Sequence, residues 1–225
     1  MRILNIYTDG ACPNNGTPEA YGGFGMAANL EHLGGPKWLQ TFYPWDRFLE
    51  TRYGKPTNQK CELAAVLFTV RGFAEEVLNN PKHRFWDVDE NGLEIVANIR
   101  IHSDSKYVVD GINTWLHNWR NNDWKNSKKK PIANMQMWKD LDIMLDYEHL
   151  RGVFSFYHVA GHSGDDGNDA ADEAANRGAE RALSGKTVLT EADWAEFVKF
   201  VEGDPMVSTL KRSTVLKKRM DLNWR

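Results

Sequence analysis

Four carboxylates occupy positions at which a charged side chain is costly. Asp9 and Asp104 come at the ends of two predicted strands, and Glu62 and Asp172 lie on or beside the apolar stripes of two predicted helices. An isolated buried carboxylate is strongly disfavoured unless it is paired or bound to a metal, and no flanking Lys or Arg offers each acid an evident partner. Converging carboxylate oxygens suit Mg²⁺ or Mn²⁺, so the sequence predicts a metal site built from these four acids.

Each of these acids also has an ordinary structural explanation. Asp9 followed by Gly10 is typical of a turn, and Glu62 is typical of an acid that stabilises the N-terminus of a helix. The metal hypothesis therefore depends on all four acids occurring together, at element ends that a mixed sheet would bring close.

The spacing of small and apolar residues predicts the two helices that carry Glu62 and Asp172. In residues 58–79 such residues and a threonine follow Glu62 at three, four, seven and eleven positions. In residues 168–183 they follow Asp172 at three, seven and eleven positions. This spacing puts Glu62 on the stripe that faces the core and Asp172 at the edge of its stripe.

Alternating and β-branched runs predict the rest of the domain. Three strands, a helix and then alternating strands and helices indicate an α/β domain with a mixed sheet and helices on both faces. Residues 44–56 are expected to be irregular, and residues 80–92 form a polar insertion with no assigned structure. The predicted strands cover residues 2–8, 22–30, 37–43, 93–102 and 153–159, and further helices are expected before residue 119, over 134–149 and over 191–202.

The composition limits the class of protein. The chain has 225 residues and a mass of 25.8 kDa, with 41% hydrophobic and 26% charged residues, which suits one globular domain with an appendage. No run approaches the roughly 18 uncharged apolar residues that a membrane helix needs, so we expect no membrane contact. Two cysteines cannot form a disulfide scaffold, and the N-terminus is typical of a strand rather than of a signal peptide. We therefore expect a monomer in the reducing cytoplasm.

Positive charge is concentrated in two segments, although the net charge is only -3. Residues 120–130 hold five Lys or Arg against one acid, and residues 203–225 hold six against two. Four tryptophans, at positions 115, 119, 124 and 138, lie in or beside the first segment. A run of charge alone is usually a solvated surface, but basic and aromatic side chains together are typical of nucleic-acid binding.

Five segments of the chain resemble ribonuclease H of type 1, in residue type and in order. Each segment alone is a weak signal, but all five in one order are specific, and the resemblance covers about residues 1–183. It implies an RNase H-like five-stranded mixed sheet with helices on both faces. Residues 184–225 lie outside the resemblance, and we expect them to form a C-terminal helical and basic extension of unknown role. The segments are residues 7–12 (YTDGAC), 57–65 (TNQKCELAA), 103–108 (SDSKYV), 111–125 (GINTWLHNWRNNDWK) and 158–172 (HVAGHSGDDGNDAAD).

The resemblance also implies an activity. The family is a hydrolase, an endonuclease that cleaves the RNA strand of an RNA–DNA hybrid and leaves 3′-hydroxyl and 5′-phosphate ends. Asp9, Glu62, Asp104 and Asp172 match its carboxylates, which hold two Mg²⁺ ions that Mn²⁺ can replace, and His162 matches its mobile catalytic histidine. In such a site one ion activates water and the other stabilises the leaving oxygen.

The same resemblance assigns residues to the two strands of the hybrid. Lys55, Thr57 and Asn134 match a pocket that grips a DNA phosphate, although Lys55 stands where cellular relatives are expected to have arginine, which binds phosphate with two parallel hydrogen bonds. The segment 120–130 matches a basic protrusion that lies against the duplex. The residues that match minor-groove contacts are Asn15, Asn58 and Gln59, and those that match contacts to the DNA sugars are Tyr107, Trp115 and Trp119.

Alternatives remain at this point. Trp115 and Trp119 also have the spacing of aromatic residues that pack on the core of a helical segment. The chain could be a non-catalytic hybrid-binding module on the same fold, which the presence of all four carboxylates and His162 disfavours. It could also be a transposase-like strand-transfer enzyme, which would need neither the histidine loop nor the basic segment with its tryptophans. Residues 44–53 and 81–92 depart from the family as insertions.

Overall fold

A computed structural model describes residues 3–31, 37–79, 86–88, 94–96, 98–146, 152–161 and 163–185. The chain divides into two units, Met1–Val188 and Leu189–Arg225, and the described residues all belong to the first. The helix predicted at 191–202, and all but the first two residues of the predicted extension, lie outside them. The predicted domain boundary after residue 183 therefore stays a prediction.

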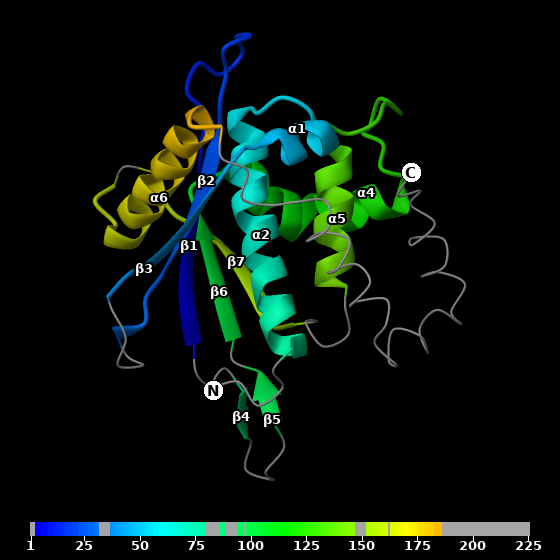
Figure 1. Ribbon diagram of the computed structural model, residues 1–225. Coiled ribbons are helices and arrows are strands. Elements are labelled where there is room, and N and C mark those ends of the chain that lie inside the picture. The colour runs from blue at the N-terminus through cyan, green and yellow to red at the C-terminus, as the bar shows by residue number, and fades with distance from the viewer. Residues whose placement is uncertain are drawn as a thin grey trace. The chain divides into compact units, whose positions relative to one another are not determined.

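The main sheet has five strands in the order β3-β2-β1-β6-β7 (Figure 1). β1 (Ile3–Ala11) pairs antiparallel with β2 (Gly23–Ala28), which pairs antiparallel with β3 (Leu39–Pro44). On the other side of β1, β6 (Asn98–Ser103) runs parallel to it, and β7 (Phe154–His158) runs parallel to β6 at the edge. The prediction of a five-stranded mixed sheet is confirmed.

The single strand predicted over residues 93–102 is wrong, because two strands occupy it. β5 (Glu94–Val96) pairs with β4 (Trp86–Val88) in a separate antiparallel sheet of two strands, and β6 begins at Asn98. The polar insertion thus contributes a strand that pairs with the start of the segment predicted as one strand. Periodicity does not separate β5 from β6, because apolar residues recur through both segments.

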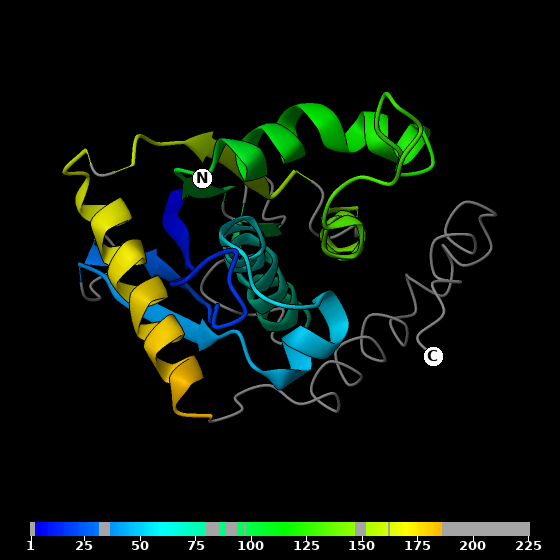
Figure 2. The same cartoon turned by 90° about the horizontal axis from the view of Figure 1, so that it is seen from above.

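Helices cover both faces of the sheet, as predicted (Figures 1 and 2). α6 (Asp166–Leu183) packs on β1, β2 and β3 from one side, and α2 (Asn58–Asn79) packs on β1 and β2 from the other, with α5 (Met135–Leu145) against α2. Between β6 and α5 the chain forms α3 (Lys106–Asp110), the π-helical turn η2 (Gly111–Trp115) and α4 (Leu116–Asn121). In the part of the chain that the structure describes, no helix is both long and apolar enough to span a membrane.

Residues 44–56, predicted to be irregular, contain the short helix α1 (Arg47–Tyr53). Asp46 caps its N-terminus by accepting a 3.1 Å hydrogen bond from the backbone N–H of Leu49, and Gly54 ends it with a φ of 77°. Leu49 is fully buried. A helix of seven residues is too short to show an apolar repeat, which is why the prediction failed here.

α6 lies close to the sheet because β2 has glycines where α6 has alanines. A Cβ added at Gly25 would lie 2.5 Å from the Cβ of Ala174, and one added at Gly23 would lie 2.0 Å from the backbone nitrogen of Ala179. Both distances are shorter than atoms tolerate, so only glycine allows this approach of helix to sheet. The contact fixes the position of Asp172, two residues before Ala174, relative to β1 and β2.

Candidate active site

The sheet places Asp9 and Asp104 on neighbouring strands. β1 and β6 run parallel with Thr8 opposite Ser103, so the next residue on each chain is one of the two acids. Asp104 directly follows β6, whereas β1 continues for two residues beyond Asp9. The structure therefore brings together two of the predicted metal ligands at one edge of the sheet.

Glu62 comes to the same edge because α2 lies directly against β1. A Cβ added at Gly10 would lie 2.1 Å from the backbone nitrogen of Glu62, so the helix backbone contacts the strand there. Glu62 Oε2 accepts a 2.5 Å hydrogen bond from Ser105 Oγ, and Ser105 also caps α3 by accepting from the backbone N–H of Val108. Ser105 thus joins Glu62 to the residue after Asp104.

The four acids share one electrostatic environment. Burial, and then the charges of Asp104, Asp172 and Glu62, raise the pKa of Asp9 to about 8, while a hydrogen bond from the backbone N–H of Gly10 opposes the shift. Burial also raises the pKa of Glu62, and the charge of Asp104 adds to this rise although the hydrogen bond from Ser105 opposes it. The folded protein therefore resists full ionisation of the cluster when no cation is bound.

The chemistry of the cluster fits a divalent cation. Within the described residues, none of the four acids forms an ion pair with a Lys or Arg. The donors are all carboxylate oxygens, which are hard ligands of the kind that Mg²⁺ prefers. A cation would supply the positive charge that the neighbouring side chains do not.

The acids are close in space but do not surround a single point. Among the described residues, no three His, Cys, Asp or Glu side chains converge as closely as one metal ion requires. Two of the acids are held by neighbours: Glu62 by Ser105, and Asp172 by Asn176 Nδ2, which donates to its Oδ1 at 3.1 Å. An ion bound at this edge would have to draw these side chains together.

His162 lies outside the described residues, so its role stays a prediction. The chain on either side of it is described. A Cβ added at Gly161 would lie 2.7 Å from Asp104 Oδ2, so the backbone passes directly against this carboxylate. Ser163 Oγ donates a 2.8 Å hydrogen bond to the carbonyl oxygen of Ala160. The loop that carries the histidine therefore begins beside one of the four acids.

Tyr107 links two groups of residues that the sequence assigned to the DNA strand. Its hydroxyl oxygen accepts hydrogen bonds from Trp138 Nε1 at 2.7 Å and from Asn134 Nδ2 at 3.2 Å. Asn134 has a left-handed backbone conformation, with φ 54°, directly before α5. The predicted sugar contact and one member of the predicted phosphate pocket thus form one hydrogen-bonded unit.

The tryptophans of this region form a row that runs from the core to the surface. Ring centroids lie 5.1 Å apart between Trp138 and Trp119 and 5.6 Å apart between Trp119 and Trp115. Trp138 is completely buried, whereas Trp115 is 36% exposed. A Cβ added at Gly111 would lie 2.2 Å from the Trp138 ring, so this glycine makes room for it. Core packing accounts for Trp138 but not for Trp115.

The residues predicted to contact the minor groove lie on two adjoining segments. Asn58 and Gln59 are the first residues of α2, Asn15 lies in the turn after β1, and all three side chains are exposed. Lys55 Nζ donates a 3.3 Å hydrogen bond to the carbonyl oxygen of Pro18, so that turn lies against the segment before α2.

The predicted phosphate pocket has two separate sides. Thr57 Oγ1 accepts a 3.3 Å hydrogen bond from the backbone N–H of Lys60, and Lys60 Nζ donates at 2.6 Å to the carbonyl oxygen of Lys55. Lys55 and Thr57 are therefore held by the start of α2. In the described part of the chain, no hydrogen bond joins either of them to Asn134.

The first residue of the basic segment forms ion pairs within the fold. Arg120 pairs with Asp142 on α5 and with Asp146, which directly follows α5, so this charge helps to hold α4 to α5. Lys125, Lys128, Lys129 and Lys130 are exposed. The backbone N–H of Ile132 donates a 3.0 Å hydrogen bond to the carbonyl oxygen of Trp124, which closes the loop at its base.

Sequence reasoning missed Ser105, the hydrogen-bond partner of Glu62. A local signal was present, because a serine that follows a strand and precedes a helix is a favoured cap. That signal places its hydroxyl at the start of α3 but does not reveal the second contact, which joins residues 43 positions apart.

Comparisons with known proteins show the family to which the chain belongs. The family model for RNase H matches residues 1–180. A ribonuclease H of Nitrosospira multiformis is 33% identical over 188 residues, which cover 81% of this chain and 93% of that protein.

Solved structures share the fold. LC9-RNase H1, a type 1 RNase H with the type 2 active-site motif, aligns with a TM-score of 0.55 at 22% identity, over 87% of this chain and 81% of that one. The foamy viral protease-reverse transcriptase in complex with an RNA/DNA hybrid aligns with a TM-score of 0.56 at 22% identity, over 79% of this chain and 20% of that one. Together with the family match over most of its length, these findings show that the chain belongs to the RNase H family.

Proposed function

We propose that the protein hydrolyses the RNA strand of RNA–DNA hybrids, cutting within the strand and leaving 3′-hydroxyl and 5′-phosphate ends. The cluster of Asp9, Glu62, Asp104 and Asp172 carries this proposal, because it raises the pKa of Asp9 to about 8 and pairs with no Lys or Arg among the described residues. These acids would hold two Mg²⁺ ions, or Mn²⁺ in their place, which supply charge stabilisation for the attacking water and for the leaving oxygen.

The protein itself supplies proton transfer and position. Phosphodiester hydrolysis depends on in-line positioning and charge stabilisation more than on a protein nucleophile. His162 would accept or return a proton at the attacking water or the product, as imidazole groups can do near neutral pH. Gly161 and Gly164, the latter with φ 77°, lie on either side of it in the sequence, and glycine permits backbone conformations there that other residues avoid.

A hybrid substrate accounts for the exposed side chains around the cluster. Recognition of a hybrid needs contacts to the 2′-hydroxyls of one strand and a close fit to the deoxyriboses of the other. The foamy viral protein, which shares the fold, was solved with such a hybrid bound. We assign Asn15, Asn58 and Gln59 to the minor groove, Tyr107, Trp115 and Trp119 to the DNA sugars, and Lys55, Thr57 and Asn134 to a DNA phosphate.

We also propose that the protein acts as a monomer in the cytoplasm. Its two cysteines are free thiols, as a reducing compartment maintains them. Light scattering during size-exclusion chromatography tests the monomer, and a mass of twice 25.8 kDa would contradict it.

Labelling each strand of a hybrid in turn tests the proposed activity. With Mg²⁺ present, the labelled RNA strand should be cut and the labelled DNA strand should stay intact, while duplex DNA and duplex RNA are both left whole. Binding of the hybrid without any cleavage would favour a non-catalytic binding module. Joining or cutting of DNA strands would favour a strand-transfer enzyme.

A further inference from the structure

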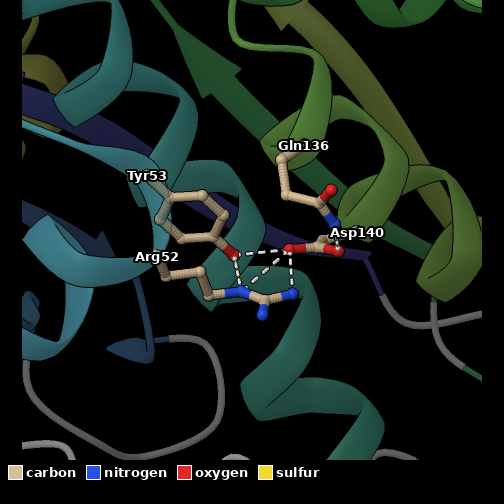
Figure 3. A network of polar contacts seen from close by, with 4 residues as sticks. All are labelled: Arg52, Tyr53, Gln136 and Asp140. Atoms are coloured by element: carbon tan, nitrogen blue, oxygen red, sulfur yellow. Dashed lines mark hydrogen bonds and ion pairs between the residues drawn. The ribbon is translucent and has the colours of Figure 1, made fainter. Parts of the chain in front are cut away.

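Four side chains form a polar network between α1 and α5 (Figure 3). Asp140 Oδ2 accepts hydrogen bonds from Arg52 Nη2 at 2.7 Å, from Arg52 Nε at 3.2 Å and from the Tyr53 hydroxyl at 2.6 Å. Asp140 Oδ1 accepts from Gln136 Nε2 at 2.9 Å. The side chain of Asp140 is 1% exposed and that of Arg52 is 16% exposed. Both oxygens of a buried carboxylate therefore accept hydrogen bonds from donors on two helices.

Stability alone is a weak reason for such a network. Burying an ion pair removes two charges from water, and well-packed apolar side chains of similar volume often stabilise a fold as well or better. Burial raises the pKa of Asp140 even though Arg52, Tyr53 and Gln136 donate to it and oppose the rise. What an apolar contact cannot supply is a fixed geometry, which the planar guanidinium and its donors impose on the carboxylate.

The network lies next to both sides of the proposed phosphate pocket. Tyr53 is two residues before Lys55, and Gln136 is two residues after Asn134. No hydrogen bond within the described residues joins Asn134 directly to the opposite side of the pocket. The contact of Tyr53 and Arg52 with Asp140 is thus a polar tie between the two segments that carry the pocket.

A second contact stiffens the segment on the α1 side. Trp45 Nε1 donates a 3.1 Å hydrogen bond to the carbonyl oxygen of Gly54, the residue between Tyr53 and Lys55. The chain from Arg52 to Lys55 is therefore held at its side chains and at its backbone. A displacement of α1 relative to α5 would therefore act on Lys55 through this segment, against the hydrogen bond that Lys60 Nζ donates to the Lys55 carbonyl oxygen.

We propose that Arg52 and Asp140 are positioning residues that set the distance between Lys55 and Asn134, and with it the grip on one phosphate of the DNA strand. The inference rests on the proposed function, because it presupposes a hybrid substrate. α1 lies within residues 44–53, which the resemblance predicts to be an insertion relative to the family. The tie would then be a feature of this chain, supporting a pocket in which lysine stands where arginine is expected.

The double variant Arg52→Met/Asp140→Leu tests this inference. It removes both charges of this ion pair together, which avoids leaving Asp140 buried without the guanidinium. The substrates are a set of hybrids, each with one neutral methylphosphonate in place of a DNA phosphate. For the wild type, one substitution along the DNA strand should raise KM more than the others, and it marks the phosphate in the pocket.

In the double variant, KM for the unmodified hybrid should rise roughly tenfold, the loss expected when a charge-assisted hydrogen bond to phosphate weakens. kcat should not change, because the four carboxylates are untouched. The methylphosphonate at the marked position should no longer raise KM above that of the unmodified hybrid. The matched control, Lys37→Met/Asp166→Asn, removes an exposed ion pair between the segment before β3 and α6 and should keep the wild-type profile.

An unchanged KM together with an unchanged methylphosphonate profile would overturn the positioning role while leaving hybrid cleavage intact. If the wild type cuts no hybrid, the proposed function fails, and this inference fails with it. Should circular dichroism show the double variant to be unfolded, Tyr53→Phe takes its place, since it removes only one hydroxyl from the network. Tyr53→Phe should then raise KM by a smaller factor and weaken the effect of the methylphosphonate at the same marked phosphate. An unchanged effect at that phosphate would overturn the inference.

Discussion

Ser105 Oγ donates a 2.5 Å hydrogen bond to Glu62 Oε2, so the residue after Asp104 orients a carboxylate that arrives on a different element. The bond favours the charged form of Glu62 and opposes the rise in pKa that burial causes. The same serine caps α3. The side chain of Ser105 therefore sets both the position of Glu62, an expected metal ligand, and the start of α3.

Ser105→Ala should weaken the binding of Mg²⁺ more than it weakens the fold. Loss of a side chain that orients a metal ligand typically costs about tenfold or more in metal affinity. The midpoint of a Mg²⁺ titration of hybrid cleavage should rise accordingly, and Ser105→Thr, which keeps the hydroxyl, should restore it. Ser184→Ala, at the end of α6, serves as the control. Equal midpoints for Ser105→Ala and the wild type would contradict this role.

The stability of the metal-free protein should fall as pH rises, in part because of Asp9. Its pKa is about 8 when folded and near 3.8 as a free side chain, so the folded state binds more protons between these values. The contribution of Asp9 to stability is therefore fully present below about pH 4 and is lost as pH rises through about 8. Asp9→Asn removes this dependence, because an amide does not ionise.

Melting curves in chelator check this expectation. At pH 8 Asp9→Asn should melt about 3–6 °C above the wild type, which corresponds to roughly 1.5 kcal/mol for a chain of this size. The difference should shrink at pH 5, and Mg²⁺ should raise the melting temperature of the wild type but not of the variant. Asp110→Asn, an exposed acid, is the control. A wild type whose stability is flat with pH in chelator would argue against mutual repulsion in the cluster.

Both cysteines should titrate as free thiols. Cys12 and Cys61 are buried and unpaired in a disulfide, and they lie near Asp9 and Glu62 in the sequence. A thiol reagent should therefore find two groups per chain after denaturation without reductant, and it should react slowly with the native protein because burial shields them. Fewer than two groups in the denatured protein would show that a disulfide forms.

Deletion of residues 203–225 should flatten the salt dependence of hybrid binding. Six Lys or Arg and two acids give this segment a charge of +4. Because the net charge of the whole chain is -3, the remaining residues carry -7. Each phosphate that a protein neutralises on a duplex contributes a slope of about -0.9 to log affinity against log salt. Turnover at saturating hybrid should not change, since no predicted metal ligand is removed. Identical slopes with and without the segment, or loss of folding, would contradict the prediction.

Long elements were predictable from the sequence, and short ones were not. α2 and α6 have several turns of apolar spacing, and β1 and β7 have clear strand patterns, so the sheet and both helical layers followed from local residues. α1 has seven residues and depends on the caps Asp46 and Gly54. β5 depends on its pairing with β4, a contact that no property of residues 94–96 reveals.

The candidate site divides in the same way. Asp9 and Asp104 could be placed together because parallel strands end at one edge. Glu62 could be placed because it falls on a core-facing stripe, and Asp172 because it lies at the edge of one. The Ser105 contact and the Arg52–Asp140 ion pair could not be predicted. They join residues 43 and 88 positions apart. The first depends on the packing of α2 against β1 and α3, and the second on the contact of the helix α1 with α5.

The most direct test of the central claim is hybrid cleavage by Asp104→Asn, measured beside hybrid binding. Binding should stay near that of the wild type, because the residues assigned to phosphates and sugars are unchanged, whereas cleavage of the labelled RNA strand in Mg²⁺ should be abolished. Cleavage within about tenfold of the wild-type rate, which is roughly 1.4 kcal/mol of barrier, would contradict the assignment of the four carboxylates as the site of the reaction.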